Sequence, residues 1–299
     1  MASGLTPGNR LCERVSSLQA RLGAHDLDAL LLTHSANIFY LSNFNGSAGM
    51  LLVMAKKLFL LIDARYVTVV RALLASEAGC AGMALVQVES SYEESVCRVL
   101  REAGVTRVGI ESPHMTMALH EWLERDLTGS GVELCPTTGL VEAGRVIKDA
   151  EELAVLREAG AQISGLMEQA LRRLEVGRTE REVAADVDWA IRSAGFDRPA
   201  FDTIVAAGPN TALPHAHPTD RRLAPGDLVL LDFGGVYNGY CVDLTRVASV
   251  GRPDPAATSW HEAVQEAHAA ALEAVRPGVR GSDVDGAARA ALDQRGLGD

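Results

Sequence analysis

The sequence lacks three features that would place it in common classes of protein: a long apolar run, paired cysteines and an excess of positive charge. Its most apolar stretch, residues 50–62, is interrupted by Lys56 and Lys57, and its first residues lack the apolar segment of a signal peptide, so we expect no association with a membrane. The five cysteines are scattered and never spaced as CxxC, which argues against a disulfide framework and favours a reducing cytoplasm. A formal net charge of −11 would repel phosphate backbones and makes nucleic acid an unfavourable partner.

The 299 residues have the composition of a folded protein, with 47% hydrophobic and 22% charged residues, and the length fits one large domain or two ordinary ones. Residues 1–140 alternate short aliphatic runs with helical patterns, and Ser91 and Glu94 have the spacing of a helix capping box. Alternating strands and helices predict an α/β domain. The predicted strands cover residues 27–32, 50–53, 58–62, 84–88, 108–110 and 132–134, and the predicted helices cover residues 65–74, 91–103 and 115–127.

Residues 141–299 follow a different pattern, with two helices, a strand-rich stretch and two further helices. Asp149 and Thr179 each precede a glutamate by three residues, so we predict that they cap helices ending at Gly177 and Gly195. The strand-rich stretch covers residues 201–250. The two later helices are predicted to be capped by Ser259 and Ser282.

Helices on either side of the strand-rich stretch resemble each other. VGRTEREVAADVDWAIRSAG and VRGSDVDGAARAALDQRG both run from a capping hydroxyl through an acidic residue and an Ala-rich helix to Gly. This pattern indicates a helix–helix–sheet unit that begins to repeat, although two helices that merely share ordinary caps would look the same. A half-repeat would leave a sheet edge uncovered and expose apolar positions such as Val229 and Leu231 or their neighbours.

Residues 227–250, DLVLLDFGGVYNGYCVDLTRVASV, predict a β-hairpin, because Asn238-Gly239 between apolar runs suits a type I′ turn. With that turn, Asp232 and Asp243 project from the same face as diagonal neighbours, with backbones roughly 7–8 Å apart. Such a pair of carboxylates needs compensation by a cation, a shared proton or hydrogen bonds, and a pair of divalent metals would use both. The alternative is an edge hairpin with two solvated aspartates, against which the apolar run before Asp232 argues.

A loop rich in Gly, Asn and Pro precedes the hairpin and contains His215 and His217. Loop histidines are usually solvated, and two histidines alone are weak evidence for a metal site. Their position matters more, because a loop directly before the strand of Asp232 can lie over the same site. An imidazole there could donate a proton or a hydrogen bond near neutral pH.

The sequence FDTIVAAGPNTALPHAHPT, residues 201–219, and the hairpin after it resemble the catalytic domain of the pita-bread metallopeptidases, with Xaa-Pro aminopeptidases and prolidases as the most similar members. DALLLTHSANIFYLSNFNGSAG, LIDARY and VGIESPHMT resemble the creatinase-type amino-terminal domain, and GLVEAGRVIKDAEELAVLREAG resembles the family's linker and first catalytic helix. The resemblance implies an α/β creatinase-like amino-terminal domain over residues 1–140. It implies an α+β pita-bread catalytic domain over residues 141–299 that is incomplete at its carboxyl end.

The resemblance also implies a two-metal site in which Asp232 and Asp243 are ligands, while His215 steadies the substrate or the tetrahedral intermediate from outside the metal shell. Oxygen-rich ligation suits Mn²⁺, with Zn²⁺ or Co²⁺ as alternatives. The implied activity is metal-dependent hydrolysis of the peptide bond before proline. The implied partners are proline-containing peptides and a second copy of the chain in a cytoplasmic homodimer.

One part of the family pattern is missing, because the sequence contains neither an HGxGHG-type motif nor the two later Glu ligands. We expect either a fragment of a longer enzyme or a natural truncation, and in both cases inactive protein from these 299 residues alone. Two other functions stay open: a creatinase-like amidohydrolase that acts on a small C–N substrate, and a non-catalytic pita-bread module that binds proteins.

Overall fold

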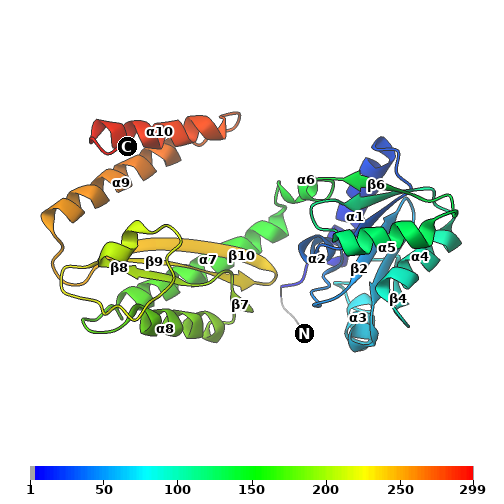
Figure 1. Cartoon of the computed structure of the whole chain (residues 1–299), viewed down its shortest axis with the longest axis horizontal. Helices are drawn as coiled ribbons and strands as arrows, with labels where there is room; N and C mark the ends of the chain where they lie inside the picture. Colours follow the sequence, from blue (N-terminus) through cyan, green and yellow to red (C-terminus); the bar gives the residue numbers. More distant parts are fainter. Residues whose placement is uncertain (1–3, 299) are drawn as a thin grey trace. The chain divides into compact units, whose positions relative to one another are not determined.

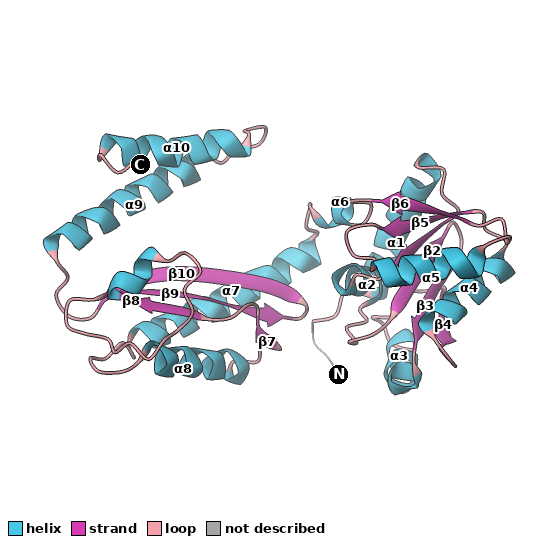
Figure 2. Cartoon of the chain, viewed as in Figure 1, coloured by secondary structure: helices cyan, strands magenta, loops and turns pink. Residues whose placement is uncertain are grey.

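The computed structural model describes residues 4–298 and divides into two compact units (Figures 1 and 2). Unit 1 comprises Met1–Glu158 with Asn238–Tyr240, and unit 2 comprises Ala159–Tyr237 with Cys241–Asp299. Among the described residues, no helix combines the length and the apolar character that a membrane crossing requires.

Unit 1 is built on a six-stranded mixed sheet with the order β4-β3-β2-β1-β5-β6. Strands β1, β5 and β6 pair in parallel, as do β3 and β4, whereas β2 is antiparallel to both of its neighbours. The strands are β1 (Ala29–Leu32), β2 (Met50–Met54), β3 (Leu58–Ile62), β4 (Met83–Gln87), β5 (Arg107–Glu111) and β6 (Glu133–Thr137). The helices are α1 (Gly8–Ala24), α2 (Ser35–Ser42), η1 (Ala64–Tyr66), α3 (Val67–Leu74), α4 (Tyr92–Ala103), α5 (Met117–Leu127) and α6 (Glu142–Arg145).

Helices cover both faces of this sheet, which explains why its central strands are apolar throughout. Leu30 and Leu32 of β1 pack into a core with α1, α2 and α3, whereas Ala29 and Leu31 pack into a second core with α4 and α5. Side chains alternate along a strand, so neighbours in sequence serve opposite cores. The predicted α/β architecture of this half is confirmed.

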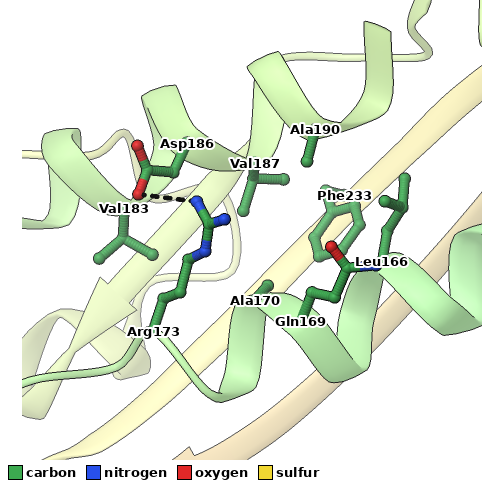
Figure 3. A pocket seen from close by; sticks show the side chains of 9 residues that line it. All are labelled: Leu166, Gln169, Ala170, Arg173, Val183, Asp186, Val187, Ala190 and Phe233. Atoms are coloured by element: carbon green, nitrogen blue, oxygen red, sulfur yellow. Dashed lines mark hydrogen bonds and ion pairs between the residues drawn. The ribbon is translucent and has the colours of Figure 1, made fainter. Parts of the chain in front are cut away.

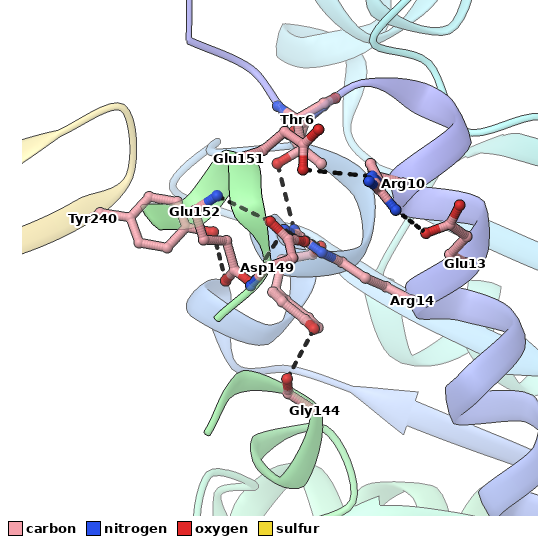
Figure 4. Close-up of polar contacts among 11 residues, drawn as sticks. Thr6, Arg10, Glu13, Arg14, Gly144, Asp149, Glu151, Glu152 and Tyr240 are labelled. Atoms are coloured by element: carbon pink, nitrogen blue, oxygen red, sulfur yellow. Dashed lines mark hydrogen bonds and ion pairs between the residues drawn. The ribbon is translucent and has the colours of Figure 1, made fainter. Parts of the chain in front are cut away.

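A buried arginine of α1 joins distant segments of unit 1 (Figure 4). The side chain of Arg14 is only 6% exposed, lies 2.7 Å from Asp149 and rests 4.2 Å from the centre of the Tyr40 ring. Tyr240, at the hairpin tip that belongs to this unit, donates a hydrogen bond of 2.9 Å to Glu152. Burial alone would lower the pKa of Arg14, but the hydrogen bond to Asp149 and nearby negative charges outweigh it, so the guanidinium stays charged.

Unit 2 has a four-stranded antiparallel sheet with one face covered by two helices, α7 (Ala150–Leu171), whose first residues up to Glu158 belong to unit 1, and α8 (Glu180–Ser193). The strands are β7 (Arg198–Pro199), β8 (Ile204–Ala207), β9 (Leu228–Tyr237) and β10 (Tyr240–Ser249). The other helices are η2 (Gly208–Ala212), α9 (Pro255–Ala274) and α10 (Gly281–Gln294). Figure 3 shows Phe233 of β9 between Val187 of α8 and Leu166 of α7, where the three side chains line a cavity of about 10 Å³. The helix pair α9 and α10 packs together.

Three predicted helix boundaries were wrong. Helix α7 ends at Leu171 rather than at Gly177, and α10 begins at Gly281, so that Ser282 lies in its first turn. Helix α9 begins at Pro255 with Asp254 as its cap, and Ser259 lies inside it. Proline at the first helical position after an aspartate is a stronger start signal than a serine with a later glutamate.

Candidate functional site

Strand β9 lies in the interior of the unit 2 sheet and positions Asp232. Val229, Leu231 and Phe233 are fully buried on the face that α7 and α8 cover. Because side chains alternate along a strand, Asp232 points to the opposite face, where it is half-buried. Val229 and Leu231 are therefore not the exposed positions of the predicted half-repeat, since the helices cover that side of the strand. Their neighbours Leu228 and Leu230 are half-buried.

The hairpin reverses at Asn238-Gly239, as predicted. Strand β9 ends at Tyr237, β10 begins at Tyr240, and the φ angles of the two turn residues are 49° and 80°. Positive φ at both positions is what a type I′ turn requires. The turn sets β10 beside β9 and places Asp243 on an edge strand of the described sheet.

The two aspartate carboxyl groups lie close enough to interact directly. Thr245 of β10 donates a hydrogen bond of 2.8 Å to Oδ1 of Asp232. Although Asp243 occupies an exposed position, partial desolvation raises the pKa of its carboxyl group, and the charge of Asp232 and a hydrogen bond between the two carboxyl groups raise it further. The metal-free pair is therefore electrostatically unfavourable when both groups are ionised.

The structure places His215 and His217 on the loop between η2 and β9, and both are exposed. In the described part of the chain, no hydrogen bond or ion pair joins either imidazole to Asp232 or Asp243, and Asp232 accepts its hydrogen bond from Thr245 instead. The roles predicted for Asp232, Asp243 and His215 stay predictions.

Glu180 holds the chain on both sides of the two histidines, at residues 207–210 and at Thr219. Its buried carboxylate accepts hydrogen bonds from the backbone N–H of Ala207 at 2.7 Å, from Asn210 Nδ2 at 3.0 Å and from the Thr219 hydroxyl, which lies 2.6 Å away. Burial alone would raise the pKa of Glu180, but these hydrogen bonds outweigh burial and lower it below its ordinary value. The loop that contains His215 is therefore anchored at both ends by one ionised side chain.

The donor set of the aspartate pair fits a hard divalent cation. Carboxylate oxygens suit Mg²⁺, Ca²⁺ and Mn²⁺, and a cation would relieve the repulsion that raises the pKa of Asp243. Within residues 4–298, no third His, Cys, Asp or Glu donor joins the two aspartates to form a closed cluster. The pair therefore supplies part of a metal site.

Comparison with known proteins places the chain in a family. The sequence model of metallopeptidase family M24 matches residues 154–299, and that of the creatinase/prolidase N-terminal domain matches residues 14–147. The uncharacterized peptidase YqhT of Bacillus subtilis is 31% identical over 287 residues, which cover 96% of this chain and 78% of that protein. The chain belongs to metallopeptidase family M24.

Solved structures of M24 proteins have the same fold. The Xaa-Pro dipeptidase from Bacillus anthracis superimposes with a TM-score of 0.89 at 30% identity, over 96% of this chain and 79% of that one. The Xaa-Pro dipeptidase of Pyrococcus furiosus is 28% identical over 287 residues, which cover 96% of this chain and 79% of that protein. The predicted fold class, a creatinase-like domain followed by a pita-bread domain, is confirmed. Membership of M24 identifies the chain as peptidase-related and implies divalent metal ions.

Proposed function

We propose that this M24 chain forms part of a metal-dependent peptidase that hydrolyses the bond before proline in Xaa-Pro peptides and releases the amino-terminal residue. The observation on which the proposal depends is the Asp232–Asp243 pair, two converging carboxylates on neighbouring strands of a metallopeptidase fold. The names of the similar proteins support the choice of substrate, because two of them are Xaa-Pro dipeptidases.

In this proposal Asp232 and Asp243 hold two divalent ions, for which oxygen donors favour Mn²⁺ over Zn²⁺ or Co²⁺. When bound, such ions supply Lewis acidity that polarises a peptide carbonyl. His215 donates a hydrogen bond to the carbonyl oxygen of the substrate as negative charge develops there. Glu180 fixes the loop and so limits the positions that the imidazole can take.

We further propose that the 299 residues alone are inactive, because two carboxylates leave most positions around two Mn²⁺ ions to water. The remaining ligands would come from sequence outside these 299 residues. The domain division at residues 140 and 141, a cytoplasmic location and a homodimer belong to the same proposal. Five free cysteines support a reducing location.

The test compares two histidines of one loop in an M24 enzyme that contains this chain with a complete ligand set. His215→Ala is expected to lower turnover of an Xaa-Pro dipeptide in Mn²⁺ by about 10²–10³-fold and to leave metal content unchanged. His217→Ala, the matched control, is expected to change turnover only slightly.

Other outcomes contradict specific parts of the proposal. Loss of a metal ion from the His215 variant would make this residue a ligand instead of a donor to substrate. Hydrolysis of small amides without peptide hydrolysis would favour an amidohydrolase, and no turnover at all would favour a non-catalytic module.

A further inference from the structure

Three potential metal ligands of unit 1 meet at the carboxyl end of its parallel strands. His34 follows β1, His114 lies in the turn after β5, and Glu142 opens α6 after β6. Because these three strands run parallel, the segments after them emerge at one edge of the sheet, where α/β sheets commonly bind ligands. One donor atom from each residue lies within 4.8 Å of the other two.

The three side chains are already neighbours. His114 Nε2 lies 3.8 Å from Oε1 of Glu142, and the imidazole rings of His34 and His114 stack with their centres 3.8 Å and their planes 4° apart. Donor atoms around a tetrahedral zinc ion lie roughly 3.4 Å apart, because each bond is about 2.0–2.1 Å long. The donor separations therefore have to shorten by about 0.4 Å between His114 and Glu142 and by at most about 1.4 Å elsewhere in the cluster. At least one ring also has to turn about its Cβ–Cγ bond, because the lone pairs of stacked imidazoles do not point at a common atom.

Two further observations point to a missing occupant. Nδ1 of His34 is buried and has no hydrogen-bond partner in the described part of the chain, which is unfavourable for a polar atom. A cavity of about 10 Å³, enough for one water-sized occupant, lies beside the cluster and is lined by His114 and Glu142 but not by His34.

Hydrogen bonds outside the cluster hold its carboxylate in place. Asn37 Nδ2 donates to Oε1 of Glu142 and to Oε1 of Glu111, in both cases at 2.6 Å. Arg145 in turn donates to Oδ1 of Asn37 at 2.7 Å. Supporting hydrogen bonds of this kind orient the ligands of metal sites in proteins.

We propose that His34, His114 and Glu142 bind one zinc ion, with water as the fourth ligand. Two imidazole nitrogens and one carboxylate form a donor set that suits zinc, whereas the aspartate pair of unit 2 offers only oxygen. Three protein ligands leave one position open, so the bound ion can also take an anion in place of water.

The test is a titration of Zn²⁺ into the full 299-residue chain in competition with a chromophoric chelator. Asp232 and Asp243 are both changed to Asn, so that the oxygen site does not contribute. We expect one equivalent of zinc with a dissociation constant of about 1 µM or lower. His34→Ala, His114→Ala and Glu142→Gln are each expected to weaken binding by at least about tenfold.

His120→Ala is the matched control, because His120 also lies beside a glutamate, 3.6 Å from Glu124, but belongs to no group of three potential metal donors within residues 4–298. Zinc binding in this variant is expected to equal that of the parent. NMR signals of the His34 and His114 rings are expected to shift together on zinc addition, as their stack opens.

Two results would overturn the proposal: saturation only at millimolar zinc, and undiminished binding in a folded His114→Ala variant. Circular dichroism establishes folding for each variant. If His34→Ala does not fold, His114→Ala still decides the question, because the His114 side chain is 32% exposed and supports little of the core.

Discussion

The carboxyl groups of Asp232 and Asp243 lie together in the metal-free protein, and the charge of Asp232 disfavours ionisation of Asp243. A cation site needs negative charges close together, whereas the stability of the metal-free fold is greater when they are far apart. The pair therefore lowers the stability of the metal-free chain while it creates affinity for a divalent ion.

Replacing either aspartate by asparagine separates these two effects. Asp232→Asn and Asp243→Asn are each expected to leave the free energy of unfolding unchanged or to raise it by up to about 1 kcal/mol without metal, because a like-charge contact is removed. Both are expected to abolish the stabilisation that Mn²⁺ adds, measured as the shift in urea midpoint with and without the ion. The exposed Asp202→Asn is the control; loss of the Mn²⁺ effect in that variant would remove the special role of the pair.

Glu180 makes the stability of unit 2 dependent on pH. Its pKa in the folded protein lies below the ordinary value of 4.5, so its ionised form adds stability above that pH, and this stability is lost as pH falls through the lowered pKa. Glu180→Gln is expected to cost about 2–3 kcal/mol at pH 7, because a neutral amide replaces a charged acceptor of several hydrogen bonds. Urea unfolding at pH 7 and pH 3 should show this difference shrink in acid, whereas the exposed Glu175→Gln should stay within about 0.5 kcal/mol of the parent at both.

These residues differ in how far the sequence predicts them. The aspartate pair is predictable because a local turn, Asn238-Gly239, fixes which side chains share a face. Glu180 is not, because its partners lie 27 to 39 residues further along the chain and only the folded backbone brings them together. The His34 cluster is hidden for the same reason, since its ligands follow three different strands.

At the scale of elements, β9 and β10 approach each other closely at Gly234. A Cβ atom at this position would lie 2.2 Å from the backbone carbonyl oxygen of Val242, so the strand pair has room only for glycine. Gly234 lies two residues from Asp232 in β9. The close approach of the two strands at Gly234 therefore also keeps β10, which contains Asp243, close to Asp232.

Gly234→Ala is expected to push β10 away from β9. The variant should lose about 1–3 kcal/mol in the free energy of unfolding, because a backbone atom has to move. Gly165→Ala, in α7 where a Cβ meets no atom within 4 Å, should instead leave stability unchanged or raise it by up to about 1 kcal/mol. Thermal denaturation measures both, and equal stability of the two variants would show that the strands adjust without strain.

Elements with strong local signals are predictable from the sequence, and others are missed for identifiable reasons. The Thr179–Glu182 capping box forms as predicted, since both of its hydrogen bonds are local. Helix α1 was not predicted, although its buried Leu11, Val15, Leu18 and Leu22 have helical spacing. In helix α2 the apolar residues are not confined to one face, so the spacing of apolar residues does not identify it as a helix.

At the scale of the whole molecule, the helix pair α9–α10 exposes apolar side chains. Trp260 and Val264, one helical turn apart, are 55% and 56% exposed, and Leu272 is 60% exposed. Contiguous exposed apolar side chains on a helix favour association with another protein surface.

We therefore expect the purified 299-residue chain to associate at micromolar concentration, which light scattering coupled to size-exclusion chromatography measures. Trp260→Glu should shift the chain towards monomer, because it places a charge in the exposed apolar row of α9. Trp189→Glu on α8 is the control, since Trp189 is 72% exposed but has Ala185 and Ser193 one turn away. A monomeric parent, or an equal effect of both variants, would contradict this prediction.

The contacts of the buried Arg14 of α1 and its neighbours can form only in a fixed order during translation. Asp149 lies 135 residues beyond it, and Tyr240 lies a further 88 residues beyond Glu152. At synthesis rates of about 5–20 residues per second, the first partner follows the arginine by about 7–27 s and the tyrosine by about 4–18 s more. Until Asp149 leaves the ribosome, the guanidinium lacks its carboxylate partner and has to remain hydrated, and Glu152 then waits for the hairpin tip before it receives the hydrogen bond of Tyr240.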